Sequence, residues 1–319
     1  MSALPHGFRI VGMVSSGRRL VDWQVAFRAH CVADPDAEPG RESYLSAFTF
    51  GPDLASLQRD DYTLDVRGFD GVCHSPFIWF DLDRDAIETA LLDARTLAEV
   101  TLHTYRELED DDLLYWFSGS KGFHLAFPTS LLPADPSTSF HRHSHRFALT
   151  LAERAGVRID EGVYRKVQPL RAPNSRHPKT GLHKVRLSYD ELFGLAAARI
   201  MELARVPREF ELDPPPQRHC PGAVNDWRAA VTQHTAAPLR EQLTSASRLT
   251  RHTLDFINCV RVPCGGQRND TLFRAVANLR ECGVPLDVIA QLVDAPARDC
   301  GLPPREIQST IRSAVRQDA

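Results

Sequence analysis

Apolar positions follow two patterns along the chain. In roughly the first 190 residues they form short runs that are rich in aromatic and β-branched side chains, which predicts strands. The expected strands cover residues 8–14, 44–50, 77–80, 113–117, 123–127 and 185–188. Apolar residues at helical spacing predict helices over residues 85–107, 139–155 and 190–204. The pattern therefore indicates an α+β fold.

The last part of the chain has helical spacing only. Capping and proline signals start three short helices near Asn269 or Asp270, at Pro285, and at Pro303 or Pro304. Three consecutive prolines at residues 214–216 form a stiff segment, which favours a domain boundary there. We therefore expect a large α+β domain over residues 1–208, a linker over 209–250 and a small all-α domain over 251–319.

Composition narrows the class of protein. The chain has 319 residues, 43% of them hydrophobic, which is enough for a sizeable core. It has no apolar segment near the roughly 20 residues that span a bilayer, and no signal-peptide pattern at its N-terminus. Its seven cysteines are scattered without a Cys-x-x-Cys pair, as expected for reduced thiols. These features predict a soluble, cytoplasmic protein with no membrane partner.

Charge is unevenly distributed behind a formal net charge of −3. Residues 81–112 carry eleven acids and three arginines, whereas residues 165–186 carry seven lysines and arginines and no acid. Both segments can be ordinary solvated surfaces. A basic strip of this length equally predicts contact with an anion.

Asp81 and Asp83 follow an apolar run and lie on the same side of the predicted strand, with Leu82 turned into the core. Adjacent carboxylates repel each other, and a divalent cation relieves that repulsion. Alternatively, the two acids cap the following helix. Asp160 ends a second short β-like run and is a candidate third ligand from another segment. Surface acid is the alternative for Asp160.

Residues 118–122 connect two apolar strands and contain two glycines, two hydroxyls and one cation. Such a turn suits phosphate oxygens, which bind backbone N–H groups and side-chain donors. His124 lies on the outgoing strand, where a polar residue needs a partner or a purpose. A plain hairpin with a polar turn is the alternative. The segment 170–182 concentrates cationic and hydroxyl donors between turn residues, which favours a polyanionic ligand such as a triphosphate.

Zinc is not predicted. The histidines at 141, 143 and 145 recur at a spacing of two, which cannot gather three ligands on one side of a helix. The pair His219 and Cys220, together with Cys259 and Cys264, fits no compact zinc spacing.

Four motifs occur in a fixed order: Asp-x-Asp, Ser-Gly-x-x-Gly-x-His, a later acid, and Arg-x-Pro-x-Ser-x-His-x-Lys-Thr-Gly-Leu. Over residues 75–195 this order resembles the archaeo-eukaryotic primase superfamily, the primase-polymerases. Residues 266–274 in the tail resemble the primase C-terminal helical domain. The resemblance implies an RNA-recognition-motif-like antiparallel sheet with flanking helices, an N-terminal αβ unit and a helical C-terminal domain. The zinc-binding knuckle of some cellular primase subunits is missing.

The resemblance also implies roles for individual residues. The residues that it assigns to catalysis and to two Mg²⁺ or Mn²⁺ ions are Asp81, Asp83 and Asp160. The residues that it assigns to the nucleotide phosphates are Ser118, Ser120, Lys121, His124, Arg171, Ser175, His177 and Lys179. The expected function is DNA-templated nucleotidyl transfer that makes or extends primers, with single-stranded DNA and NTP or dNTP as partners. No helicase region follows, so a helicase would act in trans.

Two other functions fit the same motifs. A replication initiator or DNA-binding accessory protein could keep a primase-like core without turnover. A different Asp-x-Asp enzyme, such as a sugar-nucleotide transferase, would leave the segment 170–182 and the helical tail unexplained.

Overall fold

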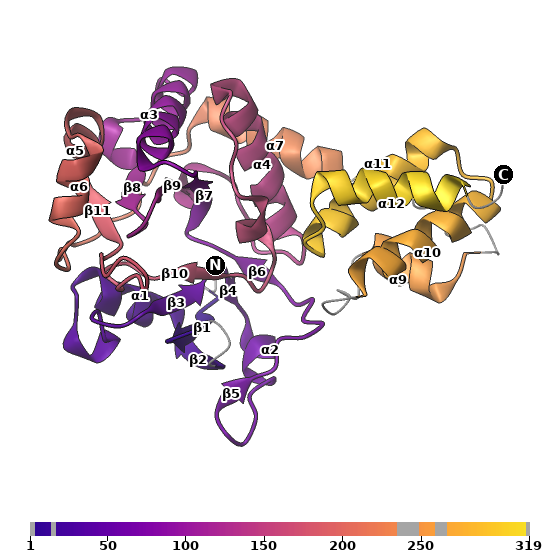
Figure 1. The fold of residues 1–319 in the computed structure, drawn as a ribbon, viewed down its shortest axis with the longest axis horizontal. Coiled ribbons are helices and arrows are strands. Elements are labelled where there is room, and N and C mark those ends of the chain that lie inside the picture. The colour runs from indigo at the N-terminus through magenta and orange to yellow at the C-terminus, as the bar shows by residue number, and fades with distance from the viewer. Residues whose placement is uncertain (1–3, 14–16, 235–248, 259–266, 317–319) are drawn as a thin grey trace. The chain divides into compact units, whose positions relative to one another are not determined.

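A computed structural model describes residues 4–13, 17–234, 249–258 and 267–316. The chain forms two compact units, Met1–Val66 with Gly71–Val231, and Arg67–Asp70 with Thr232–Ala319 (Figure 1). Helix α7 (Pro221–His234) packs Trp227 against Phe140 and Phe147. This packing places residues up to 231 in the first unit, so the expected linker over 209–250 begins inside folded structure.

The first unit contains an antiparallel sheet with strand order β10-β3-β1-β2-β5, and β4 pairs with β1 and β6. Its strands are β1 (His6–Val11), β2 (Arg18–Asp22), β3 (Ser43–Ser46), β4 (Thr49–Phe50), β5 (Thr63–Leu64), β6 (Cys73–His74) and β10 (Pro169–Arg171). Helix α1 (Trp23–Cys31) begins at Asp22, whose Oδ1 accepts a hydrogen bond from Val25 N at 3.0 Å. The apolar run 44–50 is divided between two strands. β3 pairs with β1 and β10, whereas β4 pairs with β1 and β6.

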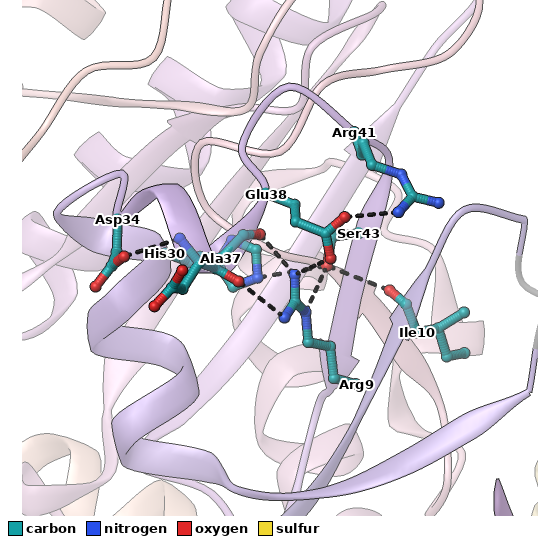
Figure 2. Close-up of polar contacts among 9 residues, drawn as sticks. Arg9, Ile10, His30, Asp34, Ala37, Glu38, Arg41 and Ser43 are labelled. Atoms are coloured by element: carbon teal, nitrogen blue, oxygen red, sulfur yellow. Dashed lines mark hydrogen bonds and ion pairs between the residues drawn. The ribbon is translucent and has the colours of Figure 1, made fainter.

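A polar network joins β1 to the loop over residues 34–41 (Figure 2). The Arg9 guanidinium donates to Ala37 O at 2.7 Å and lies 3.4 Å from Glu38 Oε1. Glu38 also pairs with Arg41 at 2.6 Å. Ser43 Oγ donates to Ile10 O and lies 3.3 Å from His30 Nε2. These contacts hold the loop on the sheet, which is a structural role.

A second antiparallel sheet has strand order β11-β8-β9-β7. Its strands are β7 (Phe77–Asp83), β8 (Leu114–Phe117), β9 (Gly122–Pro128) and β11 (Val185–Leu187). One face carries apolar residues such as Leu82 and Phe127 and is covered by α3 (Ile87–Thr104) and α4 (Phe140–Ala155) (Figure 1). The other face carries Trp79 and Trp116, and Phe27 of α1 packs against Trp79 with ring centroids 6.4 Å apart.

The helices that flank this sheet differ from expectation in two respects. Helix α3 begins after Ala86, so Asp81 and Asp83 belong to β7 and do not cap the helix, which removes that alternative. The helix expected over 190–204 is divided into α5 (Tyr189–Gly194) and α6 (Ala197–Leu203). Arg95 donates to Leu192 O and Leu195 O, which ends α5 there. A short helix, α2 (Pro52–Ala55), follows β4.

The second unit is helical. It contains α9 (Arg251–Ile257), α10 (Arg268–Glu281), α11 (Leu286–Asp299) and α12 (Pro304–Arg316). The three predicted tail helices are confirmed, and α9 is an addition. Their common core includes Leu272, Val276, Leu279, Ile289, Val293 and Ile307. Cys259, Cys264 and Gly266 lie outside the described residues. Within the described ranges, every helix is too short or too polar to cross a bilayer.

Candidate active site

A row of side chains crosses the second sheet on the face opposite α3 and α4. The strand register pairs Asp81 with His124, His124 with Trp116, and Trp116 with Arg186. His124 Nε2 lies 3.6 Å from Asp81 Oδ1, and His124 is only 4% exposed. Burial lowers the pKa of His124 well below its usual value, so this imidazole is neutral. A neutral histidine beside Asp81 can orient the carboxylate without cancelling its charge.

Asp160 lies beside this row, although the β-like run before it is not a strand. Asp160 N donates to Asp81 O at 2.8 Å, and Asp160 Oδ1 accepts from Gly162 N at the start of a short 3₁₀ helix (Glu161–Tyr164). Tyr164 OH in turn donates to Trp79 O. These contacts attach the segment that carries Asp160 along the edge of β7.

The three carboxylates crowd one another. Burial raises the pKa of Asp81 to about 7, and the neighbouring Asp160 and Asp83 carboxylates contribute to the shift, while Lys184 opposes it. Asp83 and Asp160 also line an open pocket of about 400 Å³. Lys121 lies at the same pocket, with Nζ 3.6 Å from Asp85 Oδ1.

The residues before His124 form the expected tight turn. Ser118 N donates to Gly122 O at 2.9 Å, and Gly122 N donates back to Ser118 Oγ at 3.3 Å. Gly119 adopts φ +91°, a conformation that favours glycine. A Cβ at Gly122 would lie 3.2 Å from Asp83 Oδ1, so the turn approaches the acidic strand end directly. Ser120 is half-buried in the same turn.

The turn also contacts the basic segment 170–182. Thr180 Oγ1 donates to Gly119 O, and a Cβ at Gly119 would lie 3.2 Å from His177 Cβ. Burial and the nearby Arg171 lower the pKa of His177, whereas Glu42 and, to a smaller extent, Asp83 raise it. The two segments that were proposed to bind phosphate therefore meet beside the acidic strand end. Lys179 is exposed on the same segment.

Two residues of this segment are committed to other contacts. Arg171 Nη2 donates to Tyr44 OH at 3.1 Å, and the guanidinium lies 4.9 Å from the Tyr44 ring centroid. Glu42 accepts from Tyr44 OH and lies 3.5 Å from Arg171 Nη2. Ser175 is fully buried and donates to Ala172 O at 2.8 Å, so its hydroxyl supports the loop and does not face a ligand.

Three further residues near the site, Glu42, Tyr44 and Lys184, could not be recognised from sequence motifs. Glu42 and Tyr44 belong to none of the motifs, and Lys184 was counted only as part of the basic strip over residues 165–186. Lysine is rarely buried, so the residue type argues against an interior position for Lys184. The one available signal was its position directly before a strand, where neighbouring residues are apolar.

The charge of the Asp81, Asp83 and Asp160 carboxylates suits a divalent cation, but their positions do not yet form a binding site. Hard oxygen ligands and crowded negative charge suit Mg²⁺ or Mn²⁺. Among the described residues, however, no three His, Cys, Asp or Glu side chains already converge as a ligand set for one ion. Asp81, Asp83 and Asp160 would therefore have to move closer together to share a cation.

Comparison with known proteins gives a coarse result. No protein-family model and no curated protein sequence matches the chain. The crystal structure of primase RepB' is similar over 98% of this chain and 94% of that chain, with 11% sequence identity and a TM-score of 0.38. A similarity at this level carries no conclusion about activity. The mixed fold with antiparallel sheets agrees with the expected α+β class.

Proposed function

We propose that this chain is a metal-dependent nucleotidyltransferase that synthesises or extends primers on a single-stranded DNA template, with NTP or dNTP as substrate. The observation that carries the proposal is the meeting of three segments at one end of the second sheet. Crowded carboxylates, a glycine-containing turn and a basic loop lie together there. Nucleotidyl transfer requires acids that bind the cations and hydrogen-bond donors that bind the phosphates. The carboxylates would serve the first purpose, and the turn and the loop the second.

In this proposal Asp81, Asp83 and Asp160 hold Mg²⁺ or Mn²⁺, two ions in the complete site. Bound cations of this kind activate a 3′-hydroxyl and offset the charge of the departing pyrophosphate. The resemblance assigns His124 to the nucleotide phosphates, but this side chain is buried beside Asp81, where it would orient the carboxylate instead. This chain would therefore supply a cluster of carboxylates at the end of β7 for the cations.

The phosphate-binding side of the site is built from the turn and the loop. Ser118 and Ser120 of the turn would present hydroxyl donors, and the exposed Lys121, which lines the pocket, would present an ammonium. His177 and Lys179 add donors from the loop that packs on the turn. These donors would orient a triphosphate and reduce its charge repulsion with the acids. Arg171 would join them on leaving Tyr44 and Glu42, and Ser175 would support the loop from inside.

The test is nucleotide incorporation on single-stranded DNA with Mg²⁺ or Mn²⁺, with ribonucleotides and deoxynucleotides supplied separately. Asp81→Ala and Asp83→Ala should abolish incorporation. Asp190→Ala, which removes an exposed acid from α5, serves as the control and should retain it. Full activity in both site variants would refute the assignment of these carboxylates.

Other outcomes identify other functions. Template binding without incorporation would indicate a non-catalytic initiator or accessory protein, whose helical unit supplies DNA contacts. Hydrolysis of a nucleotide sugar without dependence on template would indicate a different Asp-x-Asp enzyme. Stimulation of incorporation by an added helicase would support a helicase that acts in trans.

A further inference from the structure

The histidines that recur along α4 have no part in the proposed chemistry. One of them, His145, contacts the 3₁₀ helix Glu161–Tyr164, which directly follows Asp160 in the chain. Asp160 is one of the three proposed cation ligands. A side chain that holds this 3₁₀ helix therefore bears on where Asp160 lies.

His145 contacts the 3₁₀ helix in two ways. Its Nε2 lies 3.1 Å from Glu161 Oε2, and because a carboxylate accepts hydrogen bonds, this nitrogen is the donor. Its ring stacks on Tyr164, with centroids 4.9 Å apart and an angle of 22° between the planes. The His145 side chain is only 12% exposed, so water competes weakly for these contacts. Tyr164 OH donates in turn to Trp79 O, so α4, the 3₁₀ helix and β7 are joined through His145 and Tyr164.

The segment that carries Asp160 is held at both ends. The residues directly before Asp160 form neither helix nor strand, and Asp160 itself is exposed. At one end the Arg84 guanidinium donates to Arg158 O. At the other end His145 holds the 3₁₀ helix on α4. Between these points Asp160 N donates to Asp81 O at 2.8 Å, and this bond keeps the two acids side by side.

We propose that His145 is a positioning residue that acts through Glu161 and Tyr164 to keep Asp160 beside Asp81. This role rests on the proposed function, which makes Asp160 a cation ligand. Loss of the His145 contacts should loosen the hydrogen bond of the Asp160 amide and weaken cation binding. A contact that only stabilises the unit would lower the melting temperature and leave both of these properties unchanged.

The first test is amide hydrogen exchange at residue resolution in EDTA, which needs neither metal nor activity. In His145→Ala the Asp160 amide should exchange about tenfold faster, the scale of one lost hydrogen bond and one lost ring contact. His74→Ala is the matched control. His74 is also half-buried, its Nε2 lies 3.0 Å from Ala134 O, and its ring lies 4.7 Å from that of Phe140 on α4. The control should leave exchange at Asp160 unchanged, and unchanged exchange in His145→Ala would overturn the proposal.

Two further variants separate the hydrogen bond from the packing, and they carry the test even where His145→Ala folds poorly. His145→Gln keeps a donor for Glu161, so it should retain most of the protection of the Asp160 amide. His145→Phe keeps a ring over Tyr164 without a donor, so it should lose most of that protection. Wild-type protection in His145→Phe would assign His145 to packing alone and refute its role through Glu161.

The second test measures Mn²⁺ binding by electron paramagnetic resonance of the free ion, without nucleotide. Folded His145→Ala and His145→Phe should bind Mn²⁺ about tenfold more weakly than wild type, which is typical of losing a residue that orients a metal ligand. His145→Gln and the His74→Ala control should bind it with nearly wild-type affinity. Wild-type affinity in His145→Ala, in spite of faster exchange at Asp160, would also overturn the proposal.

The two tests also separate this inference from the proposed function. Faster exchange at Asp160 in a chain that incorporates no nucleotide would keep the hold of His145 on Asp160 and remove the proposed function. Nucleotide incorporation by wild type, with unchanged exchange in His145→Ala, would keep the function and remove the role of His145.

Discussion

Asn174 joins three segments of the first unit, and its replacement gives the sharpest stability prediction. It is fully buried, and its Oδ1 accepts from Arg208 N at 2.8 Å. Its Nδ2 donates to His30 O, Cys31 O and Arg208 O at 2.9–3.0 Å. One side chain therefore ties the end of α1 and the segment after α6 to the loop that carries the basic residues.

The loss of unfolding free energy expected for Asn174→Ala has two sources, the hydrogen bonds of the side chain and the backbone conformation of residue 174. His30 O and Cys31 O each keep a backbone donor without the Asn174 amide, from Ala33 N and Phe210 N. The bonds to Arg208 are then the main loss, and at about 1 kcal/mol per bond with a further penalty for unpaired groups they cost about 2–4 kcal/mol. Asn174 also has φ +57°, which an alanine adopts at a further cost of about 1 kcal/mol. Asn174→Ala should therefore destabilise the unit by about 3–5 kcal/mol.

Urea unfolding followed by tryptophan fluorescence measures this change, because all four tryptophans lie within the first unit. Asn174→Gly removes the same hydrogen bonds without the cost of positive φ, so it should be about 1 kcal/mol more stable than Asn174→Ala. Asn225→Ala, at an exposed position of α7, is the control and should change stability by less than about 0.5 kcal/mol. Wild-type stability in both Asn174 variants, or a glycine variant weaker than the alanine variant, would refute the reasoning.

Three further predictions address pH, the glycine turn and the helical unit. Burial lowers the pKa of His30 to about 4 from 6.5. The contribution of the neutral His30 to the unfolding free energy is therefore complete above pH 6.5 and is lost as pH falls toward 4. At pH 5 the unfolding free energy of wild type should fall by about 2 kcal/mol more than that of His30→Gln. Gly119→Ala should disturb the contact with His177 and lower both stability and nucleotide incorporation. Gly156→Ala, with similar positive φ but open space around it, should leave incorporation intact. Leu279→Ala should cost the helical unit about 2–5 kcal/mol, measured by hydrogen exchange of α10 amides, and a cost below about 1 kcal/mol would contradict its core position.

Local patterns predicted the parts of the fold whose causes are local. The two strands around residues 118–122, the acidic end of β7 and the three tail helices depend on alternation, turn residues and helix caps, and all can be found in the sequence. The division of the helix over 190–204 could not be found, since it depends on Arg95 of α3, which is about a hundred residues away in the chain. The burial of Lys184 likewise depends on distant residues, because its ammonium lies over the Trp79 and Trp116 rings.

Asp160 lies next to Asp81 although the residues before it do not form the expected strand. The apolar run before Asp160 suggested a strand, but β7 is an edge strand, and a single backbone hydrogen bond from Asp160 N to Asp81 O joins the segment to that edge. An edge strand has free carbonyls that accept such a bond without a complete ladder. The Asp160 side chain then caps the following 3₁₀ helix, and Tyr164 on that helix bonds back to Trp79. Two backbone carbonyls of β7, those of Trp79 and Asp81, thus hold Asp160 beside Asp81 and Asp83. Because Lys184 packs on the Trp79 indole, the same strand connects the acids to the buried cation.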